Sequence, residues 1–116
     1  MSALPPGQPA VLVSLLLDSA AEFGDRLDAA MDLSAFSTPE IIAALVSVAA
    51  RSSEIPDIRQ SCAESLAELW LQAGTYSPED FTRLMPDAQS IVLRYLENPQ
   101  PLWHAALSRL IPNGAA

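Results

Sequence analysis

The segment Ile55–Gly74, IPDIRQSCAESLAELWLQAG, decides the fold that we predict for this chain. Its apolar residues recur at steps of three and four, which places them on one face of an α-helix. Such a face must be buried against another part of the protein. The residues predicted to lie on it are Ile58, Cys62, Leu66, Leu69, Trp70 and Ala73.

Both ends of this helix are marked in the sequence. Pro56 suits a first helical turn, because the backbone N–H that proline lacks would have no partner there. Asp57 adds the negative charge that is favoured near a helix N-terminus. Gly74 is placed to end the helix in a left-handed cap. The sequence therefore predicts a helix over residues 56–73.

A second copy of the pattern lies 33 residues upstream, where segment 25–33, DRLDAAMDL, aligns with segment 58–66, IRQSCAESL. Periods of roughly 20 to 50 residues are typical of stacked helical units, because one helical hairpin cannot bury its own apolar face. The alternative is a chance similarity between two alanine-rich amphipathic helices. The aligned pairs are Arg26 with Arg59, Ala30 with Ala63, and Leu33 with Leu66.

The rest of the chain reads as further helices, and no segment has the sustained alternation of a strand. Residues 1–8, which contain Pro-Pro-Gly, are predicted to form a flexible leader. Gly24 is predicted to end the first helix, with Ala20 and Phe23 facing the core. Thr38 and Ser77 are predicted N-caps. The predicted helices span about residues 10–23, 25–35, 39–51, 56–73, 78–85, 87–96 and 102–110.

Composition favours one domain, predicted over residues 9–116, because half of the 116 residues are apolar and can form a core. The single cysteine, Cys62, cannot form an intramolecular disulfide and suits the core of a protein in a reducing compartment. The apolar run 10–17 has no Lys or Arg before it and is too short to span a bilayer. The sequence therefore predicts a cytoplasmic protein without a membrane segment.

The charge bears on the choice of partner. Fourteen acidic residues against six arginines and no lysine give a net charge of −8. Such a charge opposes binding to nucleic acid or to an anionic lipid surface, and it attracts a basic partner. The alternative is that the surplus of carboxylates only promotes solubility.

Catalytic motifs have little support in this sequence. The one histidine, His104, lies between Trp103 and Ala105, and one histidine cannot form the paired ligands of a helical zinc site. The four glycines are far apart, so they do not form a phosphate-binding loop. We therefore expect no enzyme activity, no cofactor and no metal site.

The stretch 56–69, PDIRQSCAESLAEL, resembles the second helix of a HEAT repeat, in which an aliphatic-Arg pair precedes small residues and then a leucine. The resemblance implies an all-α fold, a short HEAT-like α-solenoid of two to three helical hairpins with a C-terminal capping helix. It also implies that Arg26 and Arg59 contact an acid in the adjacent unit. The alternative is an irregular helical bundle. The predicted repeats span about residues 10–36, 38–74 and 77–97, followed by a terminal helix at about 101–111.

Acidic residues cluster on the two predicted second helices. At 100° per residue, each group of three acids occupies an arc of roughly 40° to 60°. If the second helices line one side of the stack, the two stripes can merge into an acidic groove that attracts a cationic partner. The alternative is that both stripes are ordinary solvated faces. The predicted binding residues are Asp25, Asp28 and Asp32, and Asp57, Glu64 and Glu68.

Phe23-Gly24-Asp25-Arg26 and Ala29-Ala30-Met31-Asp32-Leu33, together with the acidic character, resemble bacterial immunity proteins that neutralise polymorphic toxins. The resemblance implies a non-catalytic module that binds and inhibits a cognate toxin, with a basic toxin domain as the protein partner. The alternative function is an intracellular HEAT-like scaffold or regulatory adaptor. The sequence leaves open the oligomeric state and whether Trp103 is exposed.

Overall fold

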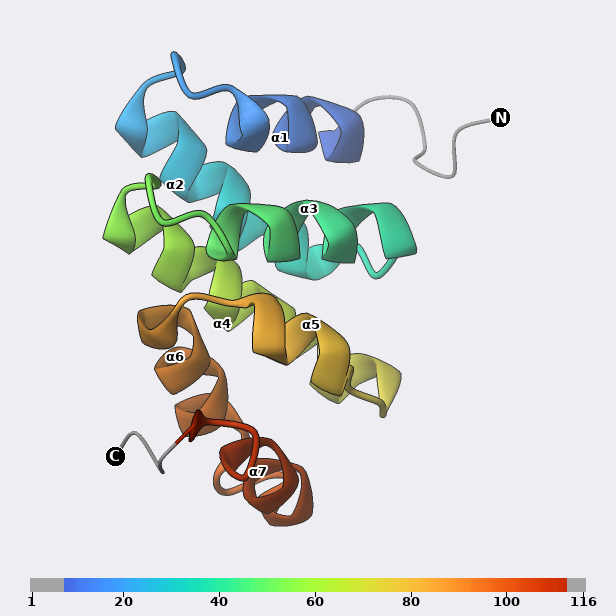
Figure 1. Cartoon of the computed structure of the whole chain (residues 1–116). Coiled ribbons are helices and arrows are strands. Elements are labelled where there is room, and N and C mark those ends of the chain that lie inside the picture. Colours follow the sequence, from blue (N-terminus) through green and yellow to red (C-terminus); the bar gives the residue numbers. More distant parts are fainter. Residues whose placement is uncertain (1–7, 113–116) are drawn as a thin grey trace.

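The computed structural model describes residues 8–112, and within them every regular element is helical. The predicted leader, except for its last residue Gln8, lies outside the described residues. Figure 1 shows the chain descending from one end of an elongated body to the other. The elements are α1 (Gln8–Leu17), α2 (Phe23–Asp32), the 3-10 turn η1 (Leu33–Ala35), α3 (Pro39–Ala49), α4 (Pro56–Ala73), α5 (Pro78–Arg83), α6 (Pro86–Leu96) and α7 (Pro101–Ser108).

The helix boundaries follow from caps and prolines. The side chains of Thr38 and Ser77 accept hydrogen bonds from Ile41 N and Asp80 N, and so cap α3 and α5 as predicted. Helices α3 to α7 each have a proline in the first turn, where the missing N–H costs nothing. Gly74 ends α4 at φ 72°, and its N–H donates to Trp70 O at 2.9 Å. The predicted limits of α4 are confirmed.

The first helix is shorter than predicted. It ends at Leu17, and Asp18 Oδ1 then accepts a hydrogen bond from Ala20 N at 2.9 Å. A short aspartate side chain that bonds a backbone N–H two residues later offers the chain a turn in place of helix. Gly24 was wrongly predicted to end the first helix and lies inside α2, while Ala20 and Phe23 are exposed.

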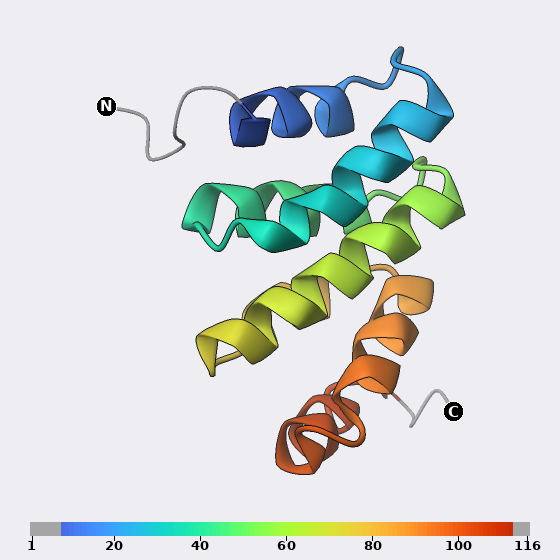
Figure 2. The same cartoon turned by 180° about the vertical axis from the view of Figure 1, so that it is seen from behind.

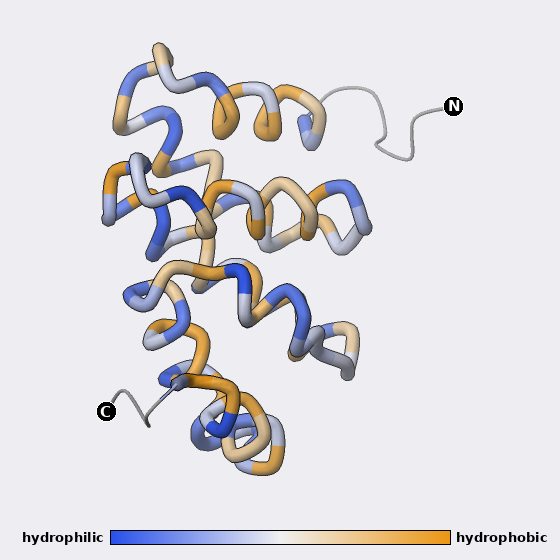
Figure 3. Tube along the Cα trace, viewed as in Figure 1, coloured by the Kyte–Doolittle hydropathy of each residue, from blue (hydrophilic) through white to orange (hydrophobic). Residues whose placement is uncertain are grey.

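Helix α4 is the centre of the fold. It packs against α2, α3 and α6, and its buried residues include Ile58, Cys62, Leu66 and Leu69. Ala73, which was predicted on this buried face, is exposed at the last turn. Figure 3 shows hydrophobic and hydrophilic residues alternating around the turns of α6, as expected for an amphipathic helix.

The helices form two layers. Figure 1 shows α1, α3 and α5 nearest the viewer, and Figure 2 shows α2, α4 and α6 on the opposite side. Helix α1 lies at one end of the body and α7 at the other. Because α2, α4 and α6 follow one another along one side, side chains from three separate stretches of sequence share a surface.

Candidate functional site

The six predicted binding acids belong to α2 and α4, which pack against each other. Asp25, Asp28 and Asp32 on α2 are exposed, as are Asp57 and Glu68 on α4, while Glu64 is partly buried. We call these six residues the acidic face. The two stripes lie on helices that are adjacent in space, although their acids are separated by 24 or more residues of chain.

Within residues 8–112, none of the six acids forms an ion pair. The arginines of the same two helices, Arg26 and Arg59, are buried and point inward. Their charges are used within the protein, so they do not neutralise the surface carboxylates. The acidic face therefore carries an uncompensated negative charge.

Arg26 forms a buried bidentate ion pair with Glu54. Its Nη1 lies 2.8 Å from Glu54 Oε2 and its Nη2 lies 2.7 Å from Glu54 Oε1. The same guanidinium donates to Leu16 O at 2.8 Å and thereby holds the end of α1. Hydrogen bonds from Arg26 hold the pKa of the Glu54 carboxyl below its usual value, although burial acts in the opposite direction.

Arg59 forms the corresponding pair with Asp87, at 3.0 Å between Nη2 and Oδ2. It also donates to Glu54 O at 2.7 Å. Burial raises the pKa of Asp87, but hydrogen bonds from Arg59 and Gln60 outweigh it and leave that pKa below its usual value. The contact of each arginine with an acid of the next helical hairpin is confirmed.

The Arg26–Glu54 and Arg59–Asp87 pairs together form a ladder of ion pairs. The sequence analysis did not identify the two acids of this ladder. Glu54 precedes Asp87 by 33 residues, the same spacing that separates Arg26 from Arg59. Both pairs thus join an arginine to an acid 28 residues later. The 33-residue period was visible in the sequence, and a search for acids at that spacing would have found both partners.

None of the six acids lines either of two hollows in the described structure, one on α1 and one beside α5. Burial raises the pKa of Tyr95 on α6, and the nearby charges of Glu64 and Glu68 on α4 raise it further. Helix α4 meets α2 through another side, where the Ser65 hydroxyl donates to Ala30 O. The α4 stripe is therefore turned toward α6, and the predicted merging of the two stripes into one groove is not observed.

A groove of about 590 Å³ lies where α3 begins and α4 ends, beside α5. The rings of Trp70 and Tyr76, on the wall of this groove, meet edge to face with their centroids 6.4 Å apart. The centroid of Tyr76 also lies 4.9 Å from that of the partly buried Trp103. Among the described lining residues the charged ones are Asp80 and Arg83, which pair with each other at 3.8 Å between Oδ1 and Nη1. This lining suits binding by apolar contact and by the hydroxyls of the loop residues.

Reactive side chains elsewhere are in unreactive surroundings. Burial raises the pKa of the Cys62 thiol to about 12, so the thiol stays protonated and lies within the core. His104 is partly buried on α7. Residues 8–112 contain no group of three or more histidine, cysteine, aspartate or glutamate side chains arranged to hold a metal ion.

Over the same described range, no helix combines the length and the apolar character that crossing a membrane requires. No protein-family model matches the chain, and no curated protein or solved structure is significantly similar to it.

Proposed function

We propose that this chain is a non-catalytic protein-binding module, an immunity protein that binds and inhibits a basic bacterial toxin domain through the acidic face of α2 and α4. The observation that carries the proposal is the uncompensated charge of that face. Six carboxylates lie on two adjacent helices, and the arginines of those helices are buried in internal ion pairs. A surface of this kind attracts a cationic partner and repels an anionic one.

We further propose that the architecture is a short HEAT-like α-solenoid. Two features support this part of the proposal. The odd- and even-numbered helices from α1 to α6 lie in separate layers, and the Arg26–Glu54 contact recurs 33 residues later as Arg59–Asp87. In stacked repeats each unit contacts its neighbours, so a ladder of this kind joins one unit to the next.

The acidic face would act mainly on the rate of association. Exposed charges steer a partner of opposite charge and gain little once the complex has formed, because water and salt screen them. At an ionic strength of about 0.15 M the Debye length is roughly 8 Å, so only charges near the interface contribute strongly. Added salt should therefore slow association.

The test replaces Asp25, Asp28 and Asp32 with asparagine and co-expresses the variant with the product of the neighbouring gene. The proposal predicts that the wild type suppresses toxicity and the triple variant does not. The matched control replaces three exposed acids outside the face, Glu40→Gln, Glu79→Gln and Glu97→Gln, which changes the net charge equally and should preserve suppression.

Two outcomes would contradict the proposal. Suppression by both triple variants would remove the α2 stripe from the mechanism. A neighbouring product that is harmless and does not bind the wild type would favour an adaptor with a different partner. Circular dichroism of each variant checks that the fold is kept.

A further inference from the structure

The end of the molecule formed by α1 has an apolar side that nothing in the described structure covers. Helix α1 has no charged residue between Gln8 and Leu17. Figure 3 shows it coloured mainly as hydrophobic between its ends. Val11 is 57% exposed and Leu15 is partly exposed, and both line a shallow hollow of about 370 Å³ together with Ala10, Ser14 and Asp18.

The 33-residue period explains why α1 carries apolar residues there. Val11 and Leu15 correspond to Ala44 and Val48 on α3, which are 7% and 0% exposed. The same positions are thus buried inside the molecule and uncovered at its end. Apolar residues at such exposed positions are typical of a helix surface that packs against another helix or a binding partner.

At the same end of the molecule, α2 exposes acidic residues. Asp32 corresponds to Ser65 on α4, which is buried and donates to Ala30 O on the preceding second helix. Asp28 corresponds to Ser61 by the same spacing. Asp28 and Asp32 therefore occupy the side of α2 on which a preceding helix would pack, and both are exposed.

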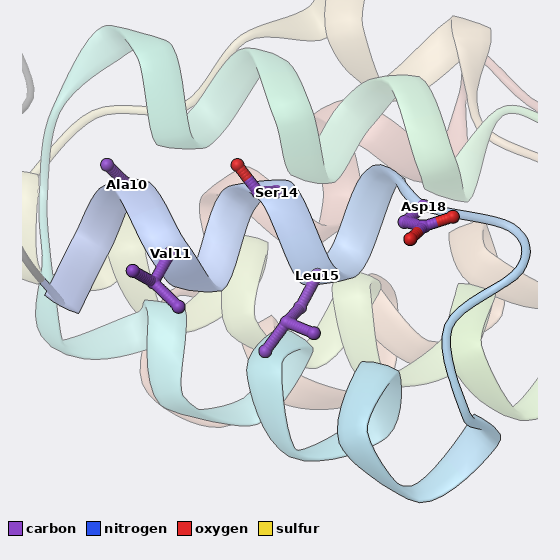
Figure 4. Close-up of a pocket in the computed structure, with 5 residues that line it drawn as sticks. All are labelled: Ala10, Val11, Ser14, Leu15 and Asp18. Carbon is purple, nitrogen blue, oxygen red and sulfur yellow. The ribbon is translucent and has the colours of Figure 1, made fainter.

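Figure 4 shows how the apolar and acidic parts meet. Val11 and Leu15 point to the side of α1 along which α2 runs, whereas Ala10 and Ser14 lie on the other side. Helices α1 and α2 pack against each other. The end of the molecule therefore presents an apolar strip on α1 next to an acidic strip on α2.

We propose that this end, made by Val11 and Leu15 on α1 and by Asp28 and Asp32 on α2, docks a cationic amphipathic helix of the partner. This inference rests on the proposed function and names the element that the acidic surface recognises. The apolar side of the incoming helix covers α1, and its basic side meets the carboxylates of α2. A second copy of this chain fits poorly, because its charge of −8 would bring further carboxylates to the acidic strip.

The two strips should contribute in different ways. Burial of exposed apolar side chains in a desolvated contact slows dissociation, since such contacts exist only in the formed complex. The carboxylates act at a distance and speed association. Substitution of Val11 should therefore raise the dissociation rate, and substitution of Asp28 and Asp32 should lower the association rate.

The probe is a labelled 18-residue peptide of leucine and lysine with all leucines on one helical face, and the reference is a peptide of the same composition in scrambled order. Fluorescence anisotropy at about 0.15 M salt measures both with the full chain. We expect the amphipathic peptide to bind more tightly than the scrambled one. Val11→Gln should weaken its binding by about tenfold, a loss typical of an interface anchor.

Matched controls lie elsewhere on the molecule. Leu102→Gln removes an apolar side chain that is even more exposed, at 82%, from α7 at the opposite end and should change binding by less than about twofold. Glu79→Gln with Glu97→Gln matches the charge change of Asp28→Asn with Asp32→Asn. The two glutamate substitutions should leave the association rate nearly unchanged, and the two aspartate substitutions should lower it.

Several outcomes would overturn this inference. The first is equal affinity for the two peptides, and the second is an equal loss of peptide affinity in Val11→Gln and Leu102→Gln. The third is a wild-type dimer, seen in sedimentation, that Val11→Gln dissociates. Co-expression separates this result from the proposed function. If Val11→Gln binds the neighbouring gene product as tightly as the wild type while the Asp25, Asp28 and Asp32 variant does not, the docking inference fails and the acidic face stands.

Discussion

The first and second helical hairpins follow a common sequence pattern but differ in what surrounds them. In the second, α3 and α4 are capped by Thr38 and Gly74, and α4 is packed on several sides. In the first, α1 ends early at an aspartate turn, and Val11 on α1 and Phe23 on α2 are exposed. The comparison teaches that a repeated pattern sets which side of a helix is apolar, and that the neighbours decide whether this side is buried.

The ladder of buried ion pairs gives the largest expected difference between the two hairpins. Glu54→Ala leaves Arg26 buried without a counter-charge and should cost about 3 to 5 kcal/mol of unfolding free energy. Asp87→Ala should cost less, about 1 to 2 kcal/mol, because Asp87 is 29% exposed and water can reach Arg59 once the carboxylate is removed. Urea unfolding measures both, and equal losses would show that the two pairs are equivalent.

The buried face of α4 can be compared with its solvated side. Leu66→Ala should cost about 2 to 5 kcal/mol, because Leu66 is fully buried at the centre of the core and its removal leaves a cavity. Glu68→Ala on the same helix should change stability by less than about 0.5 kcal/mol. Similar losses from both substitutions in thermal unfolding would contradict the assigned orientation of α4.

The ladder also predicts a dependence of stability on pH. The folded-state pKa of Glu54 lies below its ordinary value of 4.5, so its contribution is fully present above that value. The contribution is lost as the pH falls through the folded-state pKa, because the proton then binds the native carboxylate. Asp87, whose pKa is also lowered, acts in the same direction.

Unfolding midpoints measured between about pH 7 and pH 3 check this prediction. The wild type should lose stability toward the acidic end, and Glu54→Gln should lose less over the same range because it lacks the titrating group. Parallel pH profiles for the two proteins would show that Glu54 does not contribute to the acid sensitivity.

Two glycines give the smallest expected difference, with opposite signs. Gly74 has φ 72°, so Gly74→Ala places a side chain in a left-handed conformation and should cost about 1 kcal/mol. Gly24 lies in the first turn of α2, and an added Cβ there would have nothing within 4 Å. Gly24→Ala should therefore stabilise by about 0.5 kcal/mol through helix propensity. Thermal unfolding of both variants would detect a reversal of either sign.

The helices were predictable from the sequence where local signals agreed. In α4 the apolar spacing, Pro56 and Gly74 all marked the same element, and its limits are those observed. In α1 the apolar run ends at Leu17, but the predicted helix was continued through Ala20 to Phe23. The turn at Asp18 is held by the hydrogen bond from Ala20 N to Asp18 Oδ1 and by one from Ala21 N to Asp18 O. The prediction for α1 failed because Gly24 was read as a stop signal, whereas a glycine in a first helical turn costs little.

The sequence by itself determined the all-α character, the 33-residue period and the alignment of Arg26 with Arg59, since these depend on spacing along one helix or between copies of it. Only the tertiary structure decided that Glu54 and Asp87 pair with those arginines, and that α1 has an uncovered side. Both facts depend on which helices become neighbours in three dimensions. Helical periodicity marks a face for burial, and the packing of the whole chain supplies or withholds the surface that buries it.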